Sequence, residues 1–132
     1  MTVDDRRRRL TRLLAGTGAA WGLILLARPD EVVAALCPEL PRSRRWAVRL
    51  LGARLLVQHA AVLAVPEPGV VRAGSAVDLL HAASMVPLVR SARYRRAALI
   101  SGAVATGYAA LAPAVAPRSA PQTACAGVRC GA

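Results

Sequence analysis

Polar side chains interrupt two mainly apolar stretches of this 132-residue chain, and four of them have spacings that suit a common site. Arg54 and Gln58 are four residues apart in one stretch, and Asp78 and His81 are three apart in AVDLLHAASM, residues 76–85. Both spacings put the two side chains on one face of a helix. A carboxylate with an imidazole can relay protons or hold a polar ligand, and an arginine facing a carboxylate can form a charge-assisted ion pair.

The segment PEPG, residues 66–69, is expected to join these two helices as an antiparallel hairpin. Residues equally distant from the hairpin tip then lie at equal depth, which makes Arg54 level with His81 and Gln58 level with Asp78. We therefore expect Asp78 to lie between Arg54 and Gln58. His81 is expected to complete a hydrogen-bonded polar cluster with these three residues.

The predicted cluster has two interpretations. In the first, it fixes the register and packing of the hairpin, as structural ion pairs commonly do. In the second, ionisable groups inside a membrane mark a pathway or site, so that Asp78 and His81 would relay protons or bind a polar ligand. The first is favoured, because no second catalytic constellation accompanies the cluster.

Motifs for covalent, metal or cofactor chemistry are missing from the sequence. Ser75 and Ser84 lie near the cluster, but no nucleophile elbow, glycine-rich phosphate loop or oxyanion-hole candidate goes with them. His59 and His81 differ in depth by about 7.5 Å at the helical rise, which suits a pair of haem ligands poorly. We expect no enzyme activity, metal or cofactor.

Composition favours helices in a membrane. The chain is 55% hydrophobic, contains no Phe, and has a mean hydropathy of +0.41. Its net charge is +11, and all 18 basic residues are Arg. The arginine clusters border apolar segments, so anionic lipid headgroups are the expected partners. Nucleic acid is not, because no basic stripe is interleaved with aromatic or polar readers.

Four long helices are expected, over residues 10–27, 44–65, 70–89 and 97–117, with a short amphipathic segment over residues 30–41. The last long helix is uncharged and is the cleanest transmembrane signal. The first lacks a small-x-small cleavage site, so we interpret it as a retained helix rather than a signal peptide. Ser43 is the expected N-cap of the second helix, and Pro87 is expected to kink the third.

Small residues are expected to let these helices approach closely. Gly18 and Gly22 form a GxxxG step in the first helix, and Gly52 and Gly102 lie in the second and fourth. The chain then divides into a basic N-terminal tail at 1–9, a transmembrane helical domain at 10–117 and a disordered C-terminal tail at 118–132. Cys125 and Cys130 in that tail are either a disulfide or two free thiols.

The stretches RLLGARLLVQHAAVL, residues 49–63, and VDLLHAASM with RYRRAAL, residues 77–85 and 93–99, resemble small uncharacterised integral membrane proteins of actinobacteria. The shared steps are a G-x-R on one helix and a D-x-x-H on the next, within residues 45–112. The resemblance implies a four-helix membrane protein with no assigned reaction. It singles out Gly52, Arg54, Asp78 and His81.

These observations predict an all-α protein, a small transmembrane helical bundle of about four helices that crosses the cell membrane several times. Eight arginines flank each side of a four-span arrangement, so its orientation is left open. The expected role is structural or accessory within the membrane. The alternatives are a transport or proton-relay module and a lipid- or quinone-binding module. A second copy or another membrane protein is left open as a partner.

Overall fold

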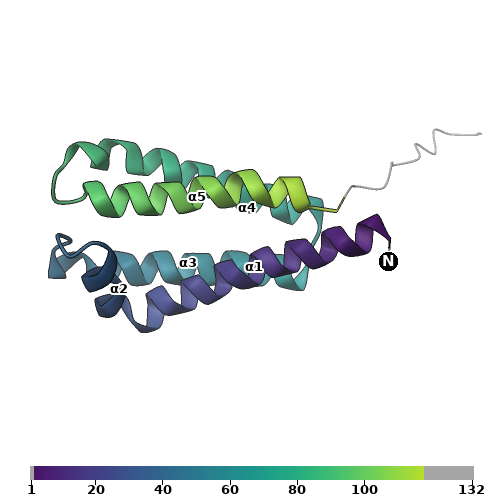
Figure 1. Cartoon of the computed structure of the whole chain (residues 1–132), viewed down its shortest axis with the longest axis horizontal. Helices are drawn as coiled ribbons and strands as arrows, with labels where there is room; N and C mark the ends of the chain where they lie inside the picture. Colours follow the sequence, from purple (N-terminus) through teal and green to yellow (C-terminus); the bar gives the residue numbers. More distant parts are fainter. Residues whose placement is uncertain (1, 118–132) are drawn as a thin grey trace, which may run out of the picture.

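The computed structural model describes residues 2–117 and is all-helical over that range, which confirms the predicted class (Figure 1). Four long helices correspond to the four expected ones. The helices, including the short α2 and two 3-10 turns, are α1 (Val3–Ala27), α2 (Pro29–Leu36), η1 (Arg42–Arg44), α3 (Arg45–Ala64), α4 (Pro68–Met85), η2 (Val86–Arg90) and α5 (Arg95–Val115). The predicted C-terminal tail, with Cys125 and Cys130, lies outside the described residues.

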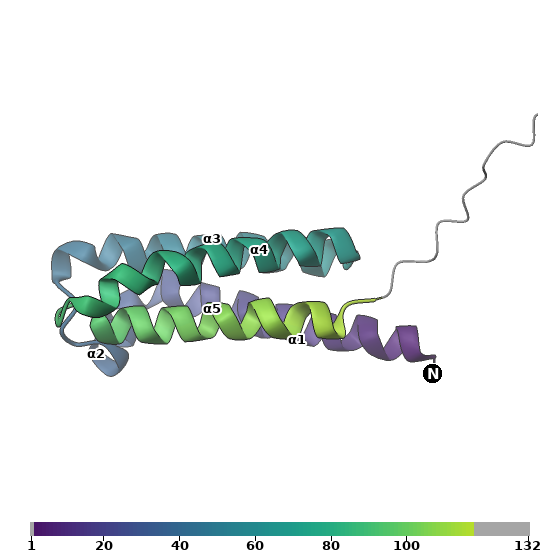
Figure 2. The same cartoon turned by 90° about the horizontal axis from the view of Figure 1, so that it is seen from above.

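The long helices form two antiparallel pairs that lie side by side. α1 packs closely against α3, and α4 packs closely against α5, whereas contacts between the two pairs are sparser (Figures 1 and 2). The N-terminus, the α3–α4 turn and the end of α5 lie at one end of the bundle, the terminal end. α2, η1 and the α4–α5 connection lie at the other, the α2 end.

The first helix begins at Val3 and not at Leu10, so the predicted basic tail is wrong for the described part of residues 1–9. Thr2 caps the helix: its hydroxyl accepts from the Asp5 amide at 3.2 Å, and its own amide donates to Asp5 Oδ2 at 3.0 Å. This reciprocal capping box satisfies two backbone donors, and acidic residues suit the positive end of the helix dipole. The arginines at 6–9 therefore extend α1.

Two other predicted boundaries were wrong because proline intervenes. Ser43 does not cap α3, since η1 follows Pro41 and leaves Arg44 at the N-cap without a side-chain hydrogen bond. Pro87 does not kink a continuous helix. Instead, α4 ends at Met85 and continues as the 3-10 turn η2, because proline lacks an N–H and cannot extend the α-helical ladder.

Glycines set the spacing of α1 and α3. A Cβ built on Gly22 would lie 2.8 Å from the Gly52 carbonyl oxygen, and one on Gly52 would lie 2.6 Å from the Gly22 carbonyl oxygen. The two backbones are therefore in contact at this crossing. A Cβ on Gly18 would overlap the His59 ring. Gly102 is different, since its Cβ would make an ordinary contact with Met85 Cβ at 3.6 Å, so it marks no close helix crossing.

We expect Gly22→Ala to destabilise the bundle by about 1–3 kcal/mol, because the added methyl would force α1 away from α3. Gly16→Ala is the matched control on the same helix, since a Cβ there meets nothing within 4 Å. It should be neutral or gain up to about 1 kcal/mol from helix propensity. Thermal unfolding of both variants in detergent measures the difference. Equal stability of the two would contradict the backbone contact.

Candidate functional site: a polar cluster beside an apolar cavity

The structure brings Arg54, Gln58 and Asp78 together between α3 and α4. Arg54 Nη2 donates to Asp78 Oδ1 at 2.6 Å and to Gln58 Oε1 at 3.1 Å. Gln58 Nε2 donates to Asp78 Oδ2 at 2.9 Å and to the Gly74 carbonyl at 3.3 Å. Both carboxylate oxygens are therefore occupied, and Asp78 lies between the two side chains of α3. We call Arg54, Gln58 and Asp78 the polar cluster.

The polar cluster is largely dry. The Asp78 side chain is 3% exposed and the Arg54 side chain 24%. Arg54 Nε and Nη1 are buried and have no hydrogen-bond partner among the described residues. An ion pair in such surroundings costs desolvation of both charges, and either charge left alone costs several kcal/mol. The carboxylate is fully paired, whereas the guanidinium is paired through Nη2 alone.

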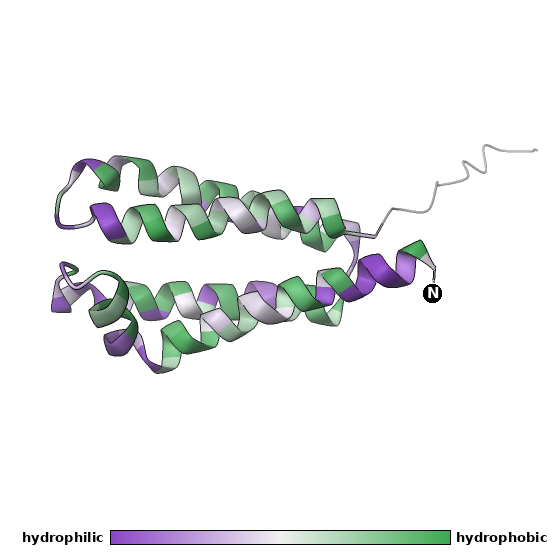
Figure 3. Cartoon of the chain, in the orientation of Figure 1, coloured by the Kyte–Doolittle hydropathy of each residue, from purple (hydrophilic) through white to green (hydrophobic). Residues whose placement is uncertain are grey.

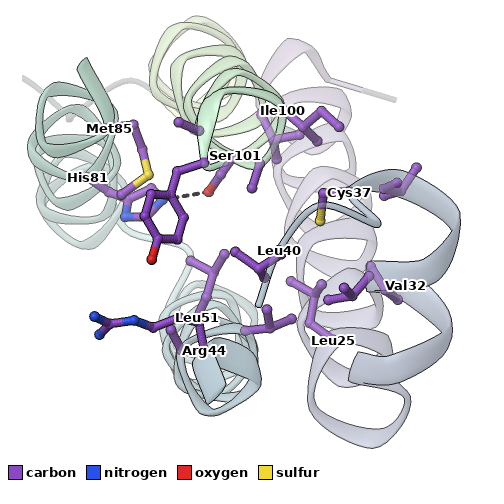
Figure 4. Close-up of a pocket in the computed structure, with 18 of the residues that line it drawn as sticks. Leu25, Val32, Cys37, Leu40, Arg44, Leu51, His81, Met85, Ile100 and Ser101 are labelled. Atoms are coloured by element: carbon purple, nitrogen blue, oxygen red, sulfur yellow. Dashed lines mark hydrogen bonds between the residues drawn. The ribbon is translucent and has the colours of Figure 1, made fainter. Parts of the chain in front are cut away.

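His81 does not join the polar cluster as predicted. Its Nε2 lies 2.7 Å from the Ser101 hydroxyl of α5 (Figure 4). Asp78 and His81 share a broad face of α4, but α4 has two neighbours in the bundle. Asp78 is turned toward α3 and His81 toward α5. Spacing along one helix could not distinguish these neighbours, and Ser101 resembled an ordinary small packing residue in the sequence.

His59 belongs to a third contact, between α3, α1 and α5. Its Nδ1 donates to the Leu55 carbonyl at 2.8 Å, because a carbonyl can only accept. The ring packs edge-on against Tyr108, with centroids 4.8 Å apart and planes at 67°, and covers Gly18. His59 is thus a buried packing residue with one ring nitrogen satisfied. Among the described residues, it makes no hydrogen bond to His81 or to the polar cluster.

Additional polar contacts join α1 to α5, from the terminal end to about the middle of α1. Arg7 Nη1 donates to the carbonyls of Ala114 and Ala116 at 3.2 and 3.1 Å. Thr11 Oγ1 lies 3.1 Å from the Val115 carbonyl, and the hydroxyls of Thr17 and Tyr108 are 3.2 Å apart. A cation is favourable at a helix C-terminus, where carbonyl groups lack intrahelical partners. These contacts hold the two helix pairs together over this part of the bundle.

Toward the α2 end the two pairs border a partly open cavity of about 450 Å³. The surrounding side chains are mainly apolar and come from α1, α2, α3, α4 and α5. Polar groups occur at two levels along the helices. Arg54, His81 and Ser101 form the inner level, whereas Arg44 and Tyr94 precede α3 and α5 at the α2 end. His81, Ser101 and Arg44 are drawn in Figure 4. Sequence patterns did not indicate this cavity, because it depends on how far apart the two pairs lie.

Cys37 also borders the cavity, from the residue after α2. Burial raises the pKa of the Cys37 thiol, the Glu39 carboxylate adds to that increase, and the Arg96 guanidinium opposes it. Within residues 2–117, no group of three or more His, Cys, Asp or Glu side chains could hold a metal ion. The arrangement therefore offers hydrogen bonding, one ion pair and apolar volume as its chemistry.

A double-mutant cycle on Arg54 and Asp78 should show coupling. Arg54→Leu leaves the carboxylate unpaired and Asp78→Asn leaves the guanidinium unpaired, and each change is expected to cost about 3–5 kcal/mol. The double variant should recover at least about 0.5 kcal/mol relative to the sum of the two losses. Thermal stability in detergent measures the cycle. The exposed Arg49→Leu should instead be additive with Asp78→Asn, and additivity for both pairs would contradict the ion pair.

Alkylation of Cys37 should be slow at neutral pH and should accelerate above the usual pKa of a thiol. The reactive species is the thiolate, and a raised pKa reduces its fraction at any given pH. Glu39→Gln should shift the rate profile to lower pH. The measurement is the alkylation rate against pH in a Cys125→Ser/Cys130→Ser background, with the denatured chain as reference. Coincident profiles for the folded and denatured chains would contradict the prediction.

Comparisons of this chain with protein-family models, with curated proteins and with solved structures found no match.

Proposed function

We propose that the protein is a small multi-pass membrane protein with a structural or accessory role, in which the polar cluster fixes the two helix pairs against each other. The observation that supports this most directly is an inverted distribution of side chains. Asp78, Ser75 and Thr11 are buried, at 2%, 7% and 2% exposure. Large apolar side chains project outward from every long helix, among them Leu13, Leu23, Leu50, Val57, Leu80, Leu99 and Leu111.

Lipid accommodates that distribution better than water does. An outward apolar surface has no cost in hydrocarbon, whereas ionisable groups within membranes face the interior of a bundle and pair there. Small residues fill the space between the helices, including Ala15, Ala98, Ala105 and Ala109, which are at most 7% exposed. Close packing through small residues is typical of helices that associate in membranes.

Helix lengths support crossing of a bilayer. Three stretches are long and apolar enough to span a membrane, namely Val3–Ala27, Arg42–Ala64 and Arg95–Val115, and each contains an 18-residue segment with a mean hydropathy of 1.5, 1.4 and 1.5, respectively. α4 is not among them. Asp78 and His81 lower its hydropathy, but both turn inward, while Leu79 and Leu80 are 55% and 73% exposed. We therefore include α4 as a fourth span.

Charged and aromatic side chains lie where the membrane interfaces would be. Hydrophilic residues gather near both ends of the bundle and apolar residues occupy much of its length (Figure 3). Trp46 is 58% exposed near the α2 end, and Tyr94 lies at that end, just before α5. Amphipathic rings and arginines favour the headgroup level. This placement agrees with helices that run across the bilayer.

The structural role is favoured over a proton relay by the hydrogen bonds. A relay needs a continuous path from an ionisable group to one surface. In the described residues both oxygens of Asp78 accept hydrogen bonds from Arg54 and Gln58, and His81 bonds to Ser101 instead.

A second candidate function is binding of a lipid or quinone. It is favoured by the cavity of about 450 Å³, a volume in the usual size range of small-ligand sites.

Labelling of introduced cysteines tests the membrane arrangement. Gly69→Cys at the terminal end and Ala92→Cys at the α2 end should react from opposite sides of the membrane, because Gly69 lies in the first turn of α4 and Ala92 lies in the connection from η2 to α5 at the other end of the bundle. The measurement is accessibility to an impermeant thiol reagent in a background without Cys37, Cys125 and Cys130. Labelling of both positions from one side would contradict the span by α4.

Alkaline carbonate washing is the control for insertion itself. The protein should remain with the membrane pellet, because only an integral protein with apolar spans resists this treatment. Release into the supernatant would overturn the membrane proposal and would leave a peripheral or soluble helical bundle.

A further inference from the structure

The cavity has an apolar part inside the bundle and a polar part toward the α2 end, and this order indicates how an occupant would lie in it. Leu25, Leu51 and Ile100 contribute apolar side chains between the two polar levels, and Val104 contributes one beyond Ser101. At the inner level, His81 and Ser101 are paired with each other. Arg54 is also at this level, but its Nε and Nη1 atoms, which have no partner among the described residues, are buried and are not exposed to the cavity. The accessible lining of the inner part is therefore mainly apolar and suits hydrocarbon.

The outer level has a different character. Arg44 precedes Arg54 by ten residues, which corresponds to about 15 Å along the helix axis. Arg44 is exposed, and its guanidinium points away from the centre of the cavity (Figure 4). Trp46 and Tyr94 also border the cavity toward this end. An elongated occupant would thus have its apolar part inside and its polar end beside Arg44.

The distribution of charge at the α2 end indicates which kind of headgroup the occupant would carry there. In the described residues, the acidic side chains there are all in ion pairs: Glu31 with Arg28, Asp30 with Arg45, and Glu39 with Arg96. Arg44 takes part in none of these pairs. The arginines that remain without an acidic partner at this end are Arg42, Arg44, Arg90, Arg93 and Arg95. A negatively charged headgroup is complementary to that excess, whereas a zwitterionic or neutral one gains less from it.

We propose that the cavity binds one acyl chain of an anionic membrane phospholipid, with the lipid phosphate held at Arg44. This inference rests on the proposed membrane location and adds a ligand to it. The acyl chain fills the apolar volume between the two helix pairs. The guanidinium of Arg44 supplies planar N–H donors suited to phosphate oxygens. The bound lipid then completes the packing that the two pairs lack toward the α2 end.

Native mass spectrometry of the full chain, released from vesicles of equal parts phosphatidylglycerol and phosphatidylcholine, tests the proposal. We expect one retained phosphatidylglycerol per chain, in preference to phosphatidylcholine. Arg44→Gln should reduce that preference about five-fold, the effect of one arginine near an anionic surface. Arg49→Gln is the matched control, because Arg49 is an exposed arginine five residues further along, in α3, that does not border the cavity. It should leave the preference unchanged.

Two substitutions test the cavity independently of charge. Val104→Trp would fill the apolar part, and Ala47→Phe would narrow the cavity from an exposed position where the bundle can accommodate a larger side chain. Both should abolish retention of lipid. The rate of Cys37 alkylation gives a second measurement, since bound phosphatidylglycerol should slow it in the parent chain and not in these variants.

Several results would overturn the inference. They are equal effects of Arg44→Gln and Arg49→Gln, lipid retention that survives both cavity substitutions, and displacement of the phospholipid by an added quinone, which would indicate a neutral ligand. A chain that stays in carbonate-washed membranes but retains no phosphatidylglycerol contradicts this inference alone. A chain released by carbonate contradicts the proposed function itself.

Discussion

The arrangement of the two helix pairs depends on the ion pair between Arg54 and Asp78. Contacts between α3 and α4 are few, and this bond of 2.6 Å with its Gln58 bridge is the principal polar link between these two helices in the described structure. Its strength comes from dry surroundings, where an unpaired charge is far more costly than in water. The link therefore fixes the register of α4 against α3 as well as their association. A shift of α4 by one residue would move Asp78 away from both Arg54 and Gln58.

On either side of that link the bundle has different properties. Toward the terminal end, Arg7 and Thr11 of α1 satisfy carbonyl groups at the end of α5, so α1 and α5 are joined directly. Toward the α2 end, apolar side chains from both pairs border open volume instead. The same fold thus combines a well-connected half with a half whose packing is incomplete, and the polar cluster lies between them.

Much of the architecture could be predicted from the sequence, for identifiable physical reasons. Apolar runs interrupted by proline located the long helices, and equal distance from the PEPG turn placed Asp78 between Arg54 and Gln58. The capping by Thr2 and Asp5 was missed, because an arginine run appeared to be a tail. The partner of His81 and the cavity could not be predicted, since both depend on the lateral arrangement of helices, which the spacing of residues along one helix does not specify.

The sequence separation of the ion pair has a consequence for biosynthesis. Asp78 follows Arg54 by 24 residues, so in the proposed membrane setting α3 leaves the ribosome with its arginine uncompensated. At about 5–20 residues per second, the carboxylate follows about 1–5 s later. Over that interval an arginine at a helix centre carries an insertion penalty of about 2.5–3.5 kcal/mol. Stable integration of α3 would therefore await the arrival of α4, and the two helices would enter the bilayer as one unit.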